Sequence, residues 1–65
     1  MEATNAFAML RKRVKMSQKD VSKQLCVSRS TVAMWETGKT IPRAEMLIKL
    51  ADLFHCTVDE LLRRD

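Results

Sequence analysis

The chain has 65 residues and a net charge of +4 at pH 7, and 46% of its residues are hydrophobic. This length allows one compact domain over residues 1–65 and excludes enzymes that need a deep pocket between large layers. The hydrophobic content excludes a disordered tail. No apolar run reaches the roughly 18 residues of a membrane span, and the N-terminus lacks a secretory signal. We therefore expect a cytoplasmic protein.

The positive charge is concentrated in the first two-thirds of the chain. Residues 1–24 carry a net charge of +4 and residues 25–43 a net charge of +2, whereas residues 44–65 carry a net charge of −2. Because a surface rich in basic side chains attracts polyanions, the first two-thirds of the chain form the candidate surface for binding a nucleic acid.

The sequence favours an all-α fold of five helices. It contains one Gly and one Pro, and no stretch alternates apolar and polar residues long enough to predict a strand. The first helix is expected to begin near Thr4 or Asn5 and to end near Lys15. Its buried face is expected to contain Phe7, Leu10 and Val14.

Two short helices follow, separated by a very tight turn. Ser17 is predicted to cap the second helix, with Asp20 in its first turn, where the helix dipole favours an acidic residue. Only residues 26–27 separate this helix from Ser28, which is the next N-cap candidate. This spacing is typical of a helix-turn-helix unit. The side chains expected to point inward are Val21, Leu25, Val32 and Trp35, together with the start of the third helix at Ser28.

The last two helices follow a loop that holds Gly38 and Pro42, the residues expected just past one helix and just before another. A fourth helix is predicted by the spacing of Leu47, Leu50, Ala51 and Phe54. Thr57 and Glu60 form a capping-box pattern that opens a short fifth helix. The fifth helix is expected to bury Val58, Leu61 or Leu62.

The outward side of the third helix is small, polar and almost uncharged. On a helical projection it holds Ser30, Ala33, Met34 and Thr37. A helix exposed only for solubility usually carries Lys and Glu, whereas a helix that enters the major groove needs narrow side chains that meet base edges. The pattern therefore favours insertion into the major groove of duplex DNA.

With these features the chain resembles the phage-repressor, or xenobiotic-response-element (Cro-like), type of helix-turn-helix transcriptional regulator. The resemblance covers nearly the whole chain. It is carried by Leu10-Arg11, Met16-Ser17-Gln18, Val27 to Val32, Trp35 to Pro42 and Thr57 to Leu62.

The resemblance implies that the start of the third helix reads bases. By position, Arg29 and Ser30 are implicated first, and Met34 and Ala33 lie further along. Arg can bind guanine in a bidentate manner, Ser can donate to or accept from several bases, and Met or Ala can contact a thymine methyl. The residues implied to contact phosphates, at helix N-termini and in the loop after the third helix, are Gln18, Lys19, Ser28, Thr31, Lys39, Thr40 and Arg43.

The resemblance also implies several structural features. Relatives often pair an arginine at the Arg11 position with a glutamate at the Glu36 position. Relatives commonly carry glycine where this chain has Lys15, Cys26 and His55, so these three residues are expected to approach positive φ.

The resemblance also implies that the protein is a repressor. We expect it to bind a pseudo-palindromic operator as a homodimer. One short helix reads only a few base pairs, so two half-sites are needed for specificity. The expected subunit seam is the C-terminal segment, with Phe54, Val58 and Leu62.

Other classes of function have weaker support in the sequence. No arrangement typical of an enzyme, a cofactor site or a small-molecule site is present, and His55 beside Cys56 lacks the partners of a metal site. We expect Cys26 and Cys56 to be reduced core thiols. The basic stretch 11–15 is either a solvated face or a DNA contact, and a membrane-surface role is disfavoured because the first helix is needed for the core. The alternative function is a protein-interaction module, such as an antitoxin-like subunit, whose exposed methionine-rich and C-terminal faces dock a partner protein; Met34 is then a partner contact.

Overall fold

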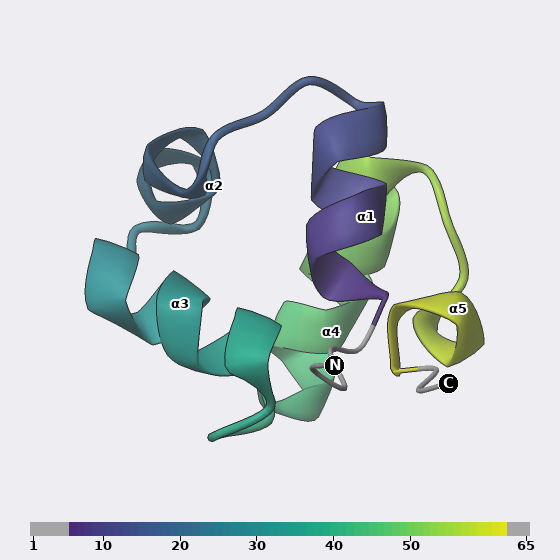
Figure 1. Ribbon diagram of the computed structural model, residues 1–65. Helices are drawn as coiled ribbons and strands as arrows, with labels where there is room; N and C mark the ends of the chain where they lie inside the picture. Colours follow the sequence, from purple (N-terminus) through teal and green to yellow (C-terminus); the bar gives the residue numbers. More distant parts are fainter. Residues whose placement is uncertain (1–5, 63–65) are drawn as a thin grey trace.

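The computed structural model describes residues 6–62, and every regular element in that range is a helix (Figure 1). The α2–α3 pair forms the helix-turn-helix unit, and α1 contacts α3, α4 and α5. The all-α, five-helix fold predicted from the sequence is confirmed. The helices are α1 (Phe7–Arg13), α2 (Gln18–Leu25), α3 (Arg29–Thr37), α4 (Ala44–Phe54) and α5 (Val58–Leu62).

The core is built around the aromatic ring of Phe7 on α1. This ring packs edge-on against Phe54, with ring centroids 5.3 Å apart, and lies 6.4 Å from the ring of Trp35. Aromatic pairs in this arrangement stabilise a fold beyond the area they bury. The other buried residues of the core are Leu10, Val21, Val32, Leu50 and Leu61.

Two expectations about apolar residues need correction. Phe54 is fully buried, so it is not available for a subunit seam. The expectation that α5 buries Val58, Leu61 or Leu62 is confirmed by Leu61, whereas Val58 is half-buried and Leu62 is 42% exposed. Cys26 is exposed and Cys56 is half-buried, so Cys26 is not a core thiol. Cys26 lies outside because it forms the turn between α2 and α3.

The first helix ends earlier than its apolar pattern predicts. Its expected start at Thr4 or Asn5 lies outside the described residues. The helix ends at Arg13 and not at Lys15, because Lys15 adopts a positive φ of 60°. The N–H of Met16 then donates to the carbonyl of Arg11 at 3.2 Å, which closes the helix.

The predicted N-caps are confirmed. The hydroxyl of Ser17 accepts from the N–H of Asp20, and the Asp20 carboxylate accepts from the N–H of Ser17. The hydrogen bond that the Asp20 carboxylate accepts from the Ser17 N–H, followed by an interaction with the Ser17 side chain, holds the pKa of Asp20 below its usual value. Thr57 and Glu60 form the same reciprocal pair at the start of α5.

The C-terminal ends of α1 to α4 share one geometry, in which a residue with positive φ follows the helix. The N–H of the next residue then donates to a carbonyl five positions back, as in the Schellman motif. Gly38 has no Cβ and adopts this conformation without strain. The three other positions carry Lys15, Cys26 and His55 in place of glycine. Their φ angles are 60°, 56° and 54°, so the positive φ expected from the resemblance is confirmed.

Replacing Cys26 with glycine is expected to stabilise the domain. A non-glycine residue in the left-handed region costs about 1–2 kcal/mol, and the extra freedom of glycine in the unfolded chain offsets about half of the gain. We expect a net increase of about 0.5–1 kcal/mol, which raises the melting temperature by several degrees. Thermal unfolding followed by circular dichroism measures this change. Cys26→Ala is the matched control, because it removes the thiol and keeps the Cβ. An equal rise for alanine would contradict the explanation from positive φ.

Candidate nucleic-acid interface

The α3 helix has one face in the core and one face toward solvent. Val32 and Trp35 are buried, with 0% and 6% exposure, as the sequence predicts. On the other side Arg29 and Ser30 are exposed, whereas Ala33 and Met34 are half-buried. The N-terminal turn of α3 is therefore the most exposed part of this face, and the side chains in the middle of the helix are less exposed.

The start of α3 is fixed by a cap that uses two of the predicted site residues. The hydroxyl of Ser28 accepts from the N–H of Thr31 at 3.1 Å, and the two hydroxyls lie 2.8 Å apart. Ser28 was expected to face inward with the buried residues of the helix, and this is wrong because Ser28 is exposed. Both hydroxyl groups therefore lie at the positively polarised end of the helix, where an anion is stabilised.

The predicted ion pair between Arg11 and Glu36 is confirmed, and the structure adds a third member to it. Arg11 Nη2 lies 2.8 Å from Glu36 Oε2, and Arg11 Nε donates to the same oxygen at 3.1 Å. The side-chain amide of Gln18 donates to Glu36 Oε1. One buried carboxylate thus connects α1, the first residue of α2 and the last turn of α3.

The contact between Gln18 and Glu36 was not foreseen from the sequence. Gln18 was singled out only as a phosphate contact, and the two residues lie 18 positions apart. The structure shows that the Gln18 side chain is held against the protein, at the N-terminal end of α2. The first N–H groups of a helix have no acceptor within the helix, so this end also offers backbone donors.

The loop after α3 carries the other predicted phosphate contacts. Lys39, Thr40 and Arg43 are all exposed. The N–H groups of Lys39 and Thr40 donate to the carbonyl of Met34, at 2.9 and 3.3 Å, so the loop is tied to the end of α3. The basic side chains therefore extend from a fixed backbone.

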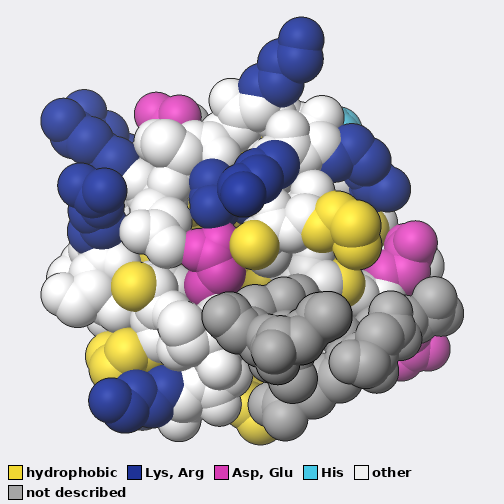
Figure 2. Space-filling view, viewed as in Figure 1, with side chains coloured by type: hydrophobic (Ala, Val, Ile, Leu, Met, Phe, Trp, Pro, Cys, Tyr) yellow, Lys and Arg dark blue, Asp and Glu magenta, His cyan; other side chains and the backbone are white. Residues whose placement is uncertain are grey.

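Charge is divided between the two halves of the described chain. Residues 6–43 contain nine Lys or Arg and two acidic residues, whereas residues 44–62 contain Lys49 and four acidic residues. Figure 2 shows most of the visible Lys and Arg side chains over the part of the molecule that holds α1 and α2, with acidic side chains among them, and further acidic side chains at the edge where α5 lies. The basic half includes the whole α2–α3 unit.

The sequence matches the family model described as helix-turn-helix over residues 7–61. The chain belongs to this family, in its Cro-like, phage-repressor type. It is 37% identical over 62 residues to the HTH-type transcriptional activator BcrR of Enterococcus faecalis, a match that covers 95% of this chain and 30% of that protein. It is 34% identical over 55 residues to repressor protein C2 of Salmonella phage P22, covering 85% of this chain and 26% of that protein.

A solved structure supports the same family. The crystal structure of a transcriptional regulator from Listeria innocua matches with a TM-score of 0.78 and 33% identity, over 95% of this chain and 60% of that one. This helix-turn-helix chain therefore spans less than two-thirds of each of these relatives. None of the helices within residues 6–62 is long and apolar enough to cross a membrane.

Proposed function

We propose that this helix-turn-helix domain binds double-stranded DNA in a sequence-specific manner and regulates transcription, with α3 in the major groove. The observation that carries this proposal is the two-sided character of α3. Val32 and Trp35 fix the helix to the core, while Arg29 and Ser30 are presented to solvent at its start. A major groove about 12 Å wide admits one helix in this orientation.

Base contacts are assigned to the exposed turn of α3. Arg29 reads guanine through its two parallel donors, and Ser30 donates to or accepts from a neighbouring base. Met34 and Ala33 are half-buried and lie deeper on the face, so they contact a base only where its edge projects, as the thymine methyl does.

Phosphate contacts are assigned to the two sides of α3. On the α2 side the held amide of Gln18 lies beside the free N–H groups of the helix end, and Ser28 and Thr31 offer hydroxyls at the start of α3. Such contacts position the helix without reading sequence. The complete set of proposed phosphate contacts is Gln18, Lys19, Ser28, Thr31, Lys39, Thr40 and Arg43.

A homodimer on a pseudo-palindromic operator gives this domain enough specificity, since two half-sites about 34 Å apart are then read together. The seam is assigned to the C-terminal helices. Leu62 is 42% exposed, and it lines the same apolar cleft as Ile41, which is 65% exposed. We assign the domain a repressor role in the cytoplasm, with no enzymatic activity, cofactor or small-molecule ligand.

Two substitutions test the assigned roles. Arg29→Ala is expected to remove about 1–3 kcal/mol of discrimination at one base position of each half-site, because it removes a bidentate base contact. Lys39→Ala is expected to weaken binding to all sequences alike, because a phosphate carries no sequence information. Selection of bound sites from a random DNA pool, followed by affinity measurements on single-base variants, separates the two effects. Uniform weakening by Arg29→Ala together with altered specificity in Lys39→Ala would reverse the roles, and absence of DNA binding would refute the proposal.

A further inference from the structure

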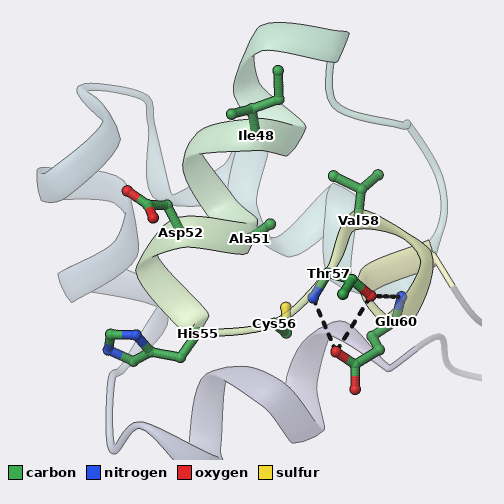
Figure 3. Close-up of a pocket in the computed structure, with 8 residues that line it drawn as sticks. All are labelled: Ile48, Ala51, Asp52, His55, Cys56, Thr57, Val58 and Glu60. Carbon is green, nitrogen blue, oxygen red and sulfur yellow. Dashed lines mark hydrogen bonds between the residues drawn. The ribbon is translucent and has the colours of Figure 1, made fainter.

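An open groove lies between α4 and α5, within the acidic half of the chain (Figure 3). It has a volume of about 470 Å³. Ile48 and Ala51 line it from α4, and Val58 lies across from them at the start of α5. Figure 1 places α5 on the opposite side of the molecule from α2, so the groove lies away from the proposed DNA-binding unit.

Ile48 exposes an apolar side chain in this groove that the core does not use. Ile48 is 65% exposed, although Leu50, Ala51 and Phe54 already fix α4 to the core. Val58 is half-buried beside it. This apolar surface, bordered by polar residues, is accessible to an interaction partner.

The wall of the groove on the α5 side is fixed by hydrogen bonds. Glu60 Oε1 accepts from the N–H of Thr57 at 2.9 Å and from its hydroxyl at 3.3 Å, and the Glu60 N–H donates to that hydroxyl at 3.0 Å. Burial, followed by the negative charge of Glu60, raises the pKa of the Cys56 thiol, which is therefore a neutral lining group near pH 7. A groove of fixed shape costs little entropy to organise on binding.

The charge beside the groove determines which occupant fits. Asp52 and Glu60 line it, whereas Lys49, the one Lys or Arg within residues 44–62, lines a different hollow beside Leu53. The guanidinium of Arg13 on α1 reaches only its edge, where it donates to the carbonyls of Phe54 and His55. The two carboxylates in the lining disfavour DNA and anionic lipid as occupants. A second copy related by a two-fold axis would bring the same acidic surface against itself, which is unfavourable.

We propose that the groove between α4 and α5 binds a basic, amphipathic segment of a different protein. An aliphatic side chain of that segment packs on Ile48 and Val58, and Lys or Arg side chains lie beside Asp52 and Glu60. A short helix with apolar residues on one face and basic residues at its borders has this chemistry. The groove shares no lining residue with the cleft of Ile41 and Leu62 to which the dimer interface is assigned, although Val58 was expected from the sequence at that interface.

Binding of a designed peptide pair to the full chain tests this assignment. The probe is a fluorescein-labelled helical peptide of roughly 14 residues, with leucines at helical spacing and lysines at the other positions. Its counterpart has glutamate in place of every lysine. We expect the basic peptide to bind with a Kd on the order of 10–100 μM at low salt, and the acidic peptide at least about tenfold more weakly. Amide shifts in the ¹⁵N spectrum should cluster at residues 48–60.

Variants of exposed residues give the matched controls. Ile48→Ser and Asp52→Lys are each expected to weaken the basic peptide about tenfold or more, whereas Met9→Ser and Glu45→Lys should change its affinity less than about twofold. Met9 is as exposed as Ile48 but lies on α1, and Glu45 lies on α4 outside the groove. Circular dichroism verifies folding of each variant. The proposal would be overturned by equal binding of both peptides or by amide shifts that map outside residues 48–60. It would also be overturned if the Ile48 or Asp52 variant lost self-association, because a second copy of the chain would then be the occupant.

Discussion

Replacing Glu36 with alanine is expected to lower the free energy of unfolding by about 3–5 kcal/mol, the range for removal of one partner from a buried ion pair. The side chains of Arg11 and Glu36 are only 11% and 10% exposed. Without the carboxylate, the guanidinium of Arg11 is left buried with one remaining acceptor, the carbonyl of Met16 at 2.8 Å. A domain of this size has a total stability of about 3–10 kcal/mol, so the variant should be largely unfolded near 37 °C.

Urea denaturation followed by circular dichroism measures this loss. The matched control is the double variant Arg11→Met with Glu36→Leu, in which no charge is left buried. Apolar replacement of a whole buried pair is often neutral, so the double variant should lie within about 1–2 kcal/mol of the parent. Asp52→Ala, at an exposed acidic residue, should change stability by less than about 0.5 kcal/mol. If the double variant were as unstable as the single one, the loss would come from packing and not from the unpaired charge.

The ion pair also shows how far the sequence predicts this fold. Features set by neighbouring residues follow from local rules: the caps at Ser17 and Thr57 each use a partner three positions away. The positive φ at Lys15 and His55 was expected because of the family resemblance, in which glycine is common there. The pairing of Arg11 with Glu36 came from the same source, since no local rule connects residues 25 positions apart.

Features that depend on how helices cross were not predictable in this way. The amide of Gln18 meets Glu36 only because α2 packs against the end of α3. The groove beside Ile48 exists because α5 leaves one side of α4 uncovered. The spacing of apolar residues in α4 contains no information about the angle at which α5 packs against it. Phe54 was assigned to a subunit seam for the same reason: the helical pattern identifies an apolar face but not which neighbour covers it.

The dependence of DNA affinity on salt is the largest effect expected for the proposed interface. The seven proposed phosphate-contacting residues of each protomer are expected to neutralise about four phosphates, three through Lys19, Lys39 and Arg43 and one through the positive end of the α2 dipole. Eight contacts in a dimer predict a slope of log affinity against log salt near −7, because each neutralised phosphate releases condensed cations. Raising the salt concentration from 50 to 200 mM should therefore weaken binding about 10⁴-fold.

Fluorescence anisotropy of a labelled duplex, titrated at several salt concentrations, measures this slope and also tests the dimer. One protomer alone predicts a slope of about −3.6, which weakens binding only about 150-fold over the same range. Lys39→Ala removes one contact from each protomer and should reduce the slope of the dimer by about two units. Lys49→Ala is the matched control, because Lys49 lies in the acidic half of the chain and should leave the slope unchanged. A flat titration would contradict the proposed phosphate contacts, since neutral hydrogen bonds alone release few ions. A slope near −3.6 would keep those contacts but contradict the dimer.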